Sequence, residues 1–243
     1  MEAREQKIDR ESVLRFRLAL ASFAGVLLLL GSLWFAYRYA PQRVETFSPN
    51  RAYCLVIDPG HGGIDGGAIA YNGVKESDLN LSIALRLQDL ASFFGVRTCM
   101  TRQDDSAKSN YSTYSEHEDL VCRAELVESV GNAVLISIHQ NAYPTSQPRG
   151  AQVLYGADTE SRILGELTHG NLIRALQPEN RRVAVPASRE LYLTSHVSCP
   201  VILVECGFMT NLSDLQQLSD PQYQRAFAAV LLGSFLQFAA ASI

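Results

Sequence analysis

Hydrophobic residues in this chain fall into short continuous runs and longer helical repeats. The three clearest runs are rich in β-branched residues and bounded by Gly, Pro or Asn, and they cover 54–57, 133–138 and 201–204. Such runs are typical of buried strands in a parallel sheet. Each run leads directly into residues that can bind or work with a metal. Because ligands of open α/β sheets lie just beyond the carboxyl ends of the strands, the pattern predicts a site at one sheet edge.

Helical repeats alternate with these runs. Apolar side chains at Leu79, Ile83, Leu87, Leu90 and Phe94 predict a helix that ends at Gly95. The remaining patterns predict a surface loop over 106–118, helices after residue 120, over 159–176 and over 221–239, and short strands at 96–101, 153–155 and 192–193. This alternation predicts an α/β fold, a three-layer sandwich in which helices flank a mostly parallel, twisted sheet.

The N-terminal region has the pattern of a membrane anchor. Residues 18–37 carry no charge, and a basic segment precedes them. Twenty helical residues at about 1.5 Å each span about 30 Å, the thickness of a bilayer core. The preceding Lys/Arg excess predicts a cytoplasmic N-terminus. A cleaved signal peptide fits less well, because the segment 37–41 ends in proline and makes a poor cleavage site.

The anchor divides the chain into four expected parts. They are a cytoplasmic tail (1–17), a transmembrane anchor (18–37), a polar linker (38–50) and one catalytic domain outside the cytoplasm (51–243). A length of about 190 residues fits one domain.

Composition narrows the class of protein. The chain is 47% hydrophobic and 19% charged, with a formal net charge of −4, which is ordinary for a globular protein. Nucleic acid is not an expected partner, since no long basic stripe is present. The five cysteines form no CxxC pair, so a structural zinc ribbon is not expected, and the spacing identifies no disulfide.

The residues after the three runs suggest a catalytic metal. His61, His139 and Glu205 each have an ordinary structural interpretation alone, but three such residues at equivalent strand ends are a rarer coincidence. A catalytic zinc usually takes three protein ligands and leaves a fourth position for water. Glu76, at the start of the first helix, could join the ligands or could simply be a favourable charge at a helix N-terminus. The spacing leaves both interpretations open.

The glycine-rich segment 60–67 does not bind nucleotides by either common pattern. Its glycines miss the dinucleotide fingerprint, and no Gly-Lys-Ser/Thr follows. Glycines there leave room around His61, which would let a large substrate approach closely.

Four motifs, in order along the chain, resemble the zinc-dependent N-acetylmuramoyl-L-alanine amidases. They are Val56 to Gly63, Lys75-Glu76, Ser137 to Ala142 and Val204 to Phe208, and Met100-Thr101-Arg102 and Arg123 also fall where that family has them. The resemblance covers roughly residues 52–240. It implies one Zn²⁺ ion bound by His61, Glu76 and His139, with Glu205 as the catalytic carboxylate.

The resemblance also implies a substrate and a reaction. The substrate is peptidoglycan, and the bond cut is the amide between the muramic acid lactyl group and L-alanine. Glu205 would take a proton from water and return it to the departing amine. Weaker candidates for substrate contact are Asn141, Arg123 and His196. Asn141 could instead cap a loop, and Asp58 could orient a ligand or fix the Asp-Pro-Gly turn.

Within that family the chain resembles the short, membrane-anchored, germination-specific amidases of spore formers, which act in muramic lactam formation in spore cortex. The shared features are the anchor, a bare catalytic domain, and a loop with Tyr111 and Tyr114 before the helix of Arg123. The alternatives are a wall amidase of growth or division, another zinc hydrolase of peptidoglycan, and an inactive wall-binding protein. A bare domain also leaves room for an activating or localising protein partner, although no residue identifies one.

Overall fold

The computed structural model describes residues 13–23, 25, 28, 30–32, 53–108 and 114–241. It divides into two compact units, Met1–Ser48 and Pro49–Ile243. In the first unit, residues 13–23 are helical and exposed. Most of the expected tail, the end of the expected anchor and the whole linker (38–50) lie outside the described residues, as does Tyr111. The anchor over 18–37 therefore stays a prediction.

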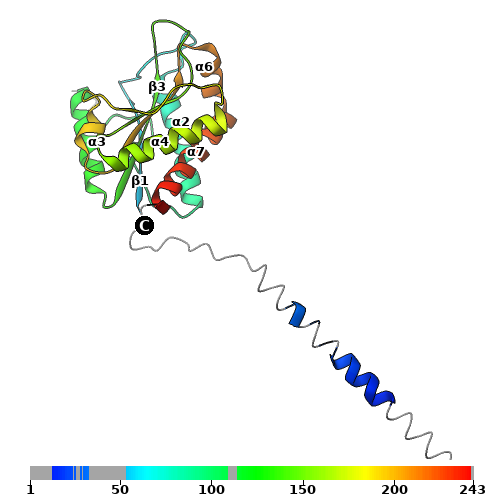
Figure 1. Ribbon diagram of the computed structural model, residues 1–243. Helices are drawn as coiled ribbons and strands as arrows, with labels where there is room; N and C mark the ends of the chain where they lie inside the picture. Colours follow the sequence, from blue (N-terminus) through cyan, green and yellow to red (C-terminus); the bar gives the residue numbers. More distant parts are fainter. Residues whose placement is uncertain are drawn as a thin grey trace, which may run out of the picture. The chain divides into compact units, whose positions relative to one another are not determined.

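A six-stranded mixed sheet forms the centre of the second unit (Figure 1). Its strands, in spatial order, are β2 (Thr98–Met100), β1 (Cys54–Pro59), β3 (Ala133–Asn141), β6 (Val201–Phe208), β4 (Gln152–Tyr155) and β5 (Val185–Pro186). The pairings are parallel except that of β4 with β6, which is antiparallel. The three runs identified from sequence are thus the three neighbouring central strands β1, β3 and β6.

Helices cover both faces of this sheet. The larger core lies on the side of α2 (Glu76–Phe93), α4 (Thr159–Leu176), α6 (Leu212–Ser219) and α7 (Pro221–Ala241). The smaller core lies on the side of α3 (Glu116–Ser129) and α5 (Tyr192–His196). Leu55 and Ile57 point into the larger core and Val56 into the smaller one, as the two-residue period of a strand requires. A continuous apolar run is needed because both faces are buried.

Most predicted elements are confirmed, and α4 has the expected limits. The predicted strand at 192–193 is wrong, since these residues begin α5. The hydroxyls of Thr194 and Ser195 donate hydrogen bonds to the carbonyl of Leu191, which stabilises a helical turn there. The predicted loop over 106–118 also ends early, because Ser115 caps α3 by accepting a hydrogen bond from the Glu118 amide.

Helix α7 is long and apolar enough to cross a membrane, and it is the only such helix in the described part of the chain. Half of its apolar window is buried within the domain. Phe227, Phe235 and Phe238 on this helix belong to the larger core, where α7 packs against α2 and α4. These contacts are those of a core helix in a folded domain.

Candidate active site

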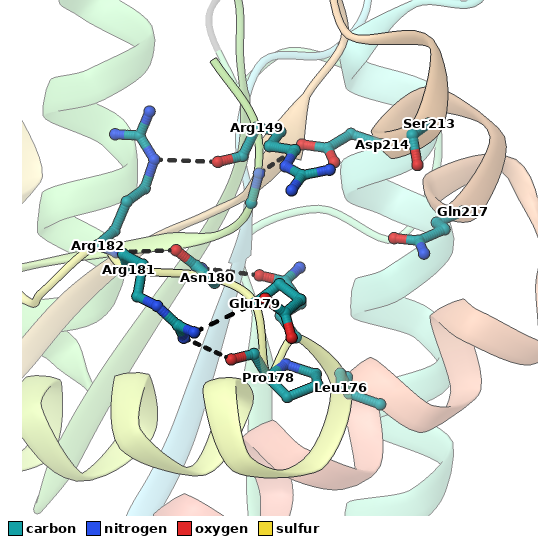
Figure 2. A pocket seen from close by; sticks show the side chains of 12 residues that line it. Arg149, Leu176, Pro178, Glu179, Asn180, Arg181, Arg182, Ser213, Asp214 and Gln217 are labelled. Carbon is teal, nitrogen blue, oxygen red and sulfur yellow. Dashed lines mark hydrogen bonds and ion pairs between the residues drawn. The ribbon is translucent and has the colours of Figure 1, made fainter. Parts of the chain in front are cut away.

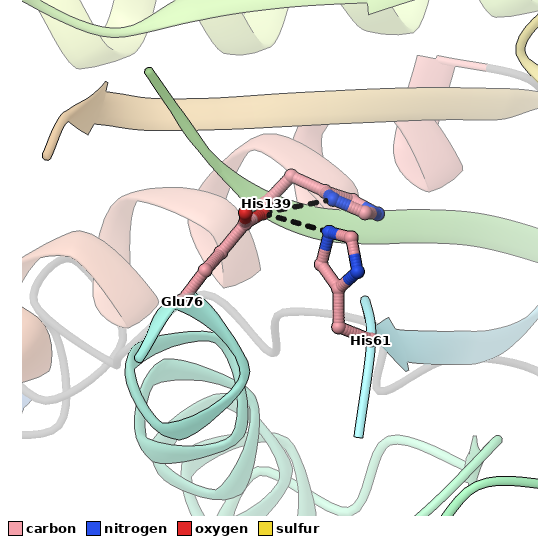
Figure 3. Close-up of side chains that lie close together, drawn as sticks. All are labelled: His61, Glu76 and His139. Atoms are coloured by element: carbon pink, nitrogen blue, oxygen red, sulfur yellow. Dashed lines mark hydrogen bonds and ion pairs between the residues drawn. The ribbon is translucent and has the colours of Figure 1, made fainter. Parts of the chain in front are cut away.

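Three side chains that are distant in sequence meet at the carboxyl edge of the sheet. His61 follows β1, Glu76 is the first residue of α2, and His139 lies near the end of β3 (Figure 3). One ligand atom from each lies within 4.8 Å of the others. The two imidazole rings meet edge to face, with their centroids 5.0 Å apart. The structure therefore gathers the three residues that the family resemblance names as ligands.

Glu76 is the centre of this cluster. Its Oε1 lies 3.2 Å from His61 Nε2 and 3.1 Å from His139 Nδ1, and its Oε2 accepts a hydrogen bond from the Ala68 amide. Burial alone would raise the pKa of Glu76, but the two histidines hold that pKa well below its usual range. Glu76 is therefore an anion between two imidazoles.

Asp65 orients His61 from the opposite side of the ring. Its Oδ2 lies 2.7 Å from His61 Nδ1 and accepts a hydrogen bond from the Tyr114 hydroxyl. This contact leaves His61 Nε2 facing Glu76. Burial would lower the pKa of His61, yet Asp65 and Glu76 together raise it to about 10. A carboxylate on the far nitrogen is the usual way in which proteins fix a metal-binding histidine.

A buried network beneath the cluster fixes the loop that carries His61. The Asp58 carboxylate accepts hydrogen bonds from Thr101, Ser137 and Arg123, at 2.6, 2.6 and 2.7 Å. Burial opposes ionisation of Asp58, but these partners, Arg123 above all, lower its pKa to about 2. Arg123 Nη2 also donates to the carbonyl of His61, whose φ is +60°. Asp58 thus fixes the loop through Arg123 rather than through a ligand side chain.

Two glycines make space for the histidine rings. A Cβ on Gly60 would lie 2.2 Å from Cε1 and Nε2 of His139. A Cβ on Gly67, whose φ is +63°, would lie 2.7 Å from Glu76 Oε2 and 2.8 Å from His61 Cδ2. The glycine loop is therefore required by the packing of the cluster as well as by its turns.

Glu205 lies directly opposite His139 in the pairing of β3 with β6. Its Oε2 is buried and has no hydrogen-bond partner among the described residues. Burial raises the pKa of Glu205; His139 and His61 oppose this, and Glu76 adds to it. A cleft of about 250 Å³ opens here, and its lining includes His61, His139 and Glu205.

The residues fit a divalent metal such as zinc. Two imidazoles and one carboxylate are a common ligand set of catalytic zinc. The unpartnered Glu205 oxygen beside them is what an acid/base needs if it is to act on a group held at the metal. The assignment of His61, Glu76 and His139 as ligands and of Glu205 as catalyst stays a prediction, which this geometry supports.

The weaker candidates do not all reach the cleft. Arg123 is 1% exposed and lies in its floor, with its guanidinium bound to Asp58, Asp119 and two carbonyls. Asn141 ends β3 and is not among the residues that line the cleft. His196 stacks on Tyr192, with the ring centroids 3.9 Å apart, and lines a different cavity.

Sequence reasoning did not identify Asp65 or Asn80 as parts of the site. Asn80 donates to the carbonyl of Gly60 and lies one helical turn after Glu76. An acidic residue four positions after a candidate histidine, and an amide four after a candidate glutamate, were the available signals.

Comparison with known proteins identifies the family. Residues 55–234 match the N-acetylmuramoyl-L-alanine amidase family. A germination-specific N-acetylmuramoyl-L-alanine amidase of Bacillus subtilis (strain 168) is 33% identical over 189 residues, which cover 76% of this chain and 78% of that protein.

Solved structures of amidases have the same fold as this chain. The CwlD amidase of Clostridioides difficile, determined in complex with the GerS lipoprotein, matches with a TM-score of 0.74 and 30% identity, covering 78% of this chain and 99% of that chain. The amidase AmiC2 of Nostoc punctiforme matches with a TM-score of 0.67 and 28% identity, covering 76% of this chain and 96% of that chain. The chain therefore belongs to the N-acetylmuramoyl-L-alanine amidase family and is an enzyme of that type.

Proposed function

We propose that this chain hydrolyses the amide between N-acetylmuramic acid and L-alanine in peptidoglycan, with zinc bound by His61, Glu76 and His139. The observation that supports this most is the meeting of these three donors within 4.8 Å, with the unpartnered carboxylate of Glu205 on the neighbouring strand. Zinc in such a site supplies Lewis-acid polarisation of the scissile carbonyl and lowers the pKa of water.

The protein's own residues supply the proton transfers and the positioning. Glu205 takes the proton of the attacking water and delivers it to the departing amine of L-alanine. Its raised pKa suits this role, because an acid/base works best when its pKa lies near the working pH. Asp65 keeps His61 Nε2 turned toward the site, and Arg123 fixes the loop behind it.

Two relatives support the biological setting that we propose. The 33% identical relative is germination-specific, and on that likeness we assign this chain to the maturation of spore cortex. The uncharged segment 18–37 would anchor it in a membrane with the N-terminus in the cytoplasm and the catalytic domain outside. The CwlD amidase was solved with a lipoprotein, and on that likeness we include a protein partner that activates or localises this chain.

The test of the chemistry is Glu205→Gln in the full chain. Loss of a positioned acid/base should lower the rate of stem-peptide release by about 10²- to 10⁴-fold, with zinc content unchanged. His61→Ala should lose zinc and activity together. Full activity of Glu205→Gln with zinc bound would contradict the proposed role.

Product analysis tests the bond. Purified peptidoglycan should yield intact stem peptides with a free L-alanine amine and an uncut glycan. Shortened stems or free acetate would instead indicate a peptidase or a deacetylase. The spore role predicts that a strain lacking this chain makes cortex without muramic lactam, and normal muramic lactam content would contradict it.

A further inference from the structure

The strand register places Gln152 beside the predicted catalytic carboxylate. Strand β4 runs antiparallel to β6, and Gln152 lies directly opposite Glu205, as Leu154 lies opposite Leu203. Directly opposite residues of an antiparallel pair project from the same face of a sheet. Leu203 and Glu205 both line the catalytic cleft. Gln152 therefore projects from the catalytic face.

Arg182 is fixed beside Gln152 by two segments, the residues at and just before the start of β4 and the end of β6. Its Nη1 donates to Gln152 Oε1 at 3.0 Å, and its Nε donates to the carbonyl of Arg149 at 3.2 Å (Figure 2). Its guanidinium carbon lies 4.6 Å from the centre of the Phe208 ring, at the end of β6. The flat face of the guanidinium lies over an aromatic ring, and two of its nitrogens donate hydrogen bonds. The group is therefore already oriented to bind a planar anion.

The described residues place no carboxylate within ion-pair distance of Arg182, and its Nη2 donates no hydrogen bond to any of them. Two other arginines of the domain differ in this respect. Arg123 is paired with Asp58 and Asp119, and Arg181 lies 3.6 Å from Glu179. A half-buried cation bound only to neutral acceptors can accept an anion from outside the chain.

Charge differs between the two sides of Glu205. The cleft toward α3 and α5 is lined by Asp65, Glu116 and Glu190. A second cavity, of about 540 Å³, is lined by three arginines, Arg149, Arg181 and Arg182, and by two carboxylates, Glu179 and Asp214. Because arginines outnumber carboxylates only in the second cavity, an anionic part of the substrate is favoured there over the acidic cleft.

The separation suits a peptide. Opposite Cβ atoms in an antiparallel pair lie about 5 Å apart, so a glutamine side chain and one hydrogen bond bring Arg182 to on the order of 10 Å from Glu205. An extended peptide advances about 3.3 Å per residue. A carboxylate about two to three residues beyond the scissile amide would reach the guanidinium.

We propose that Arg182 binds a free carboxylate of the stem peptide and so makes the enzyme prefer stems whose carboxylates are not amidated. The inference rests on the proposed function and specifies its substrate class. It also gives the substrate a direction, with the stem running from Glu205 toward β4 and Arg182.

The test uses the full chain and two muropeptides of the same length, one with free stem carboxylates and one with these converted to amides. The wild-type chain should favour the free acid by roughly 10- to 100-fold in kcat/KM, the range of a hydrogen bond between charged groups. Arg182→Gln should lose that preference, mainly through KM, and Arg182→Lys should recover part of it. Arg162→Gln, at an exposed arginine of α4 that lines neither cavity, should keep the wild-type preference.

Equal losses of Arg182→Gln on both muropeptides would show a structural role, and no loss on either would show that the substrate does not contact Arg182. Either result overturns the proposal. Binding of the isolated stem peptide, as free acid and as amide, separates this inference from the proposed function. A wild-type chain that cuts neither muropeptide but binds the free acid more tightly, through Arg182, would contradict the function and support the site. Equal binding of both peptides would overturn the site.

Discussion

Gly60 has no side chain, and His139 uses the space that this leaves. A Cβ there would lie 2.2 Å from two ring atoms of His139, far inside van der Waals contact, so Gly60→Ala should displace the ring from Glu76. We expect loss of zinc and of amidase activity together, measured as metal content and stem-peptide release. Gly170→Ala is the matched control, since nothing lies within 4 Å of its Cβ. Wild-type zinc content in Gly60→Ala would contradict this account of the loop.

Asp65 should act on metal affinity rather than on the proton transfer. Asp65→Asn removes the anion that holds His61 Nδ1, and losses of such partners typically weaken metal binding by about 10- to 100-fold. Activity should fall at limiting zinc and recover when zinc is in excess. Glu190→Gln removes an equivalent charge from the same cleft without a contact to a ligand and should bind zinc normally. An Asp65→Asn defect that excess zinc leaves unchanged would indicate another role.

At the scale of elements, Asp58 and Arg123 join β1 to α3. Because the pKa of Asp58 is about 2 in the folded chain against an ordinary 3.8, its ionisation stabilises the fold above about pH 4 and that contribution is lost as the pH falls through 2. Asp58→Asn also leaves Arg123 buried with one carboxylate fewer. It should lower the free energy of unfolding by about 3–5 kcal/mol at pH 7.

Urea unfolding at pH 7 and at pH 2.5 checks this prediction. The difference between the wild-type chain and Asp58→Asn should narrow at the lower pH, because Asp58 is partly protonated there. Asp89→Asn, at an exposed position of α2, should have the same free energy of unfolding as the wild-type chain at both pH values. A difference that is independent of pH would mean that Asp58 stabilises the fold by shape and not by charge.

The elements that the sequence predicts well are those whose two faces are both buried. The strands at 54–57, 133–138 and 201–204 can be predicted without knowing which elements pack against them, because a strand covered on both faces is apolar throughout. Residues 192–193 were too few to show a period, and their helix depends on local hydroxyl-to-carbonyl hydrogen bonds. β5 has only two residues, and α6 begins where Asn211 caps it.

The sequence predicts those residues of the site that lie at the ends of buried strands. The strand ends indicate His61, His139 and Glu205, whereas the spacing of Glu76 fits a metal ligand and a helix N-terminal charge equally well, and only the family resemblance favours the ligand. Arg182 gave no sequence signal, because its position depends on the antiparallel β4 and on the Phe208 ring. Such contacts come from the packing of segments far apart in the chain, which periodicity does not record.

At the scale of the whole molecule, two segments are apolar and long enough to cross a membrane, 18–37 and α7. Helix α7, however, contributes Phe227, Phe235 and Phe238 to the core of the unit Pro49–Ile243. Removing it would unfold the domain, so α7 cannot both fold the enzyme and leave it for a bilayer. A chain lacking residues 1–48 should therefore appear in the soluble fraction.

That shortened chain should keep its kcat/KM on soluble muropeptides within about twofold, since a compact unit with its own core can fold alone. The full chain should sediment with membranes and resist extraction by high salt, because a spanning helix is held by apolar contacts rather than charge. Fractionation of both chains, with stem-peptide release measured in each fraction, checks this. Membrane association of the shortened chain would place the contact on the catalytic domain itself and would contradict an anchor at 18–37.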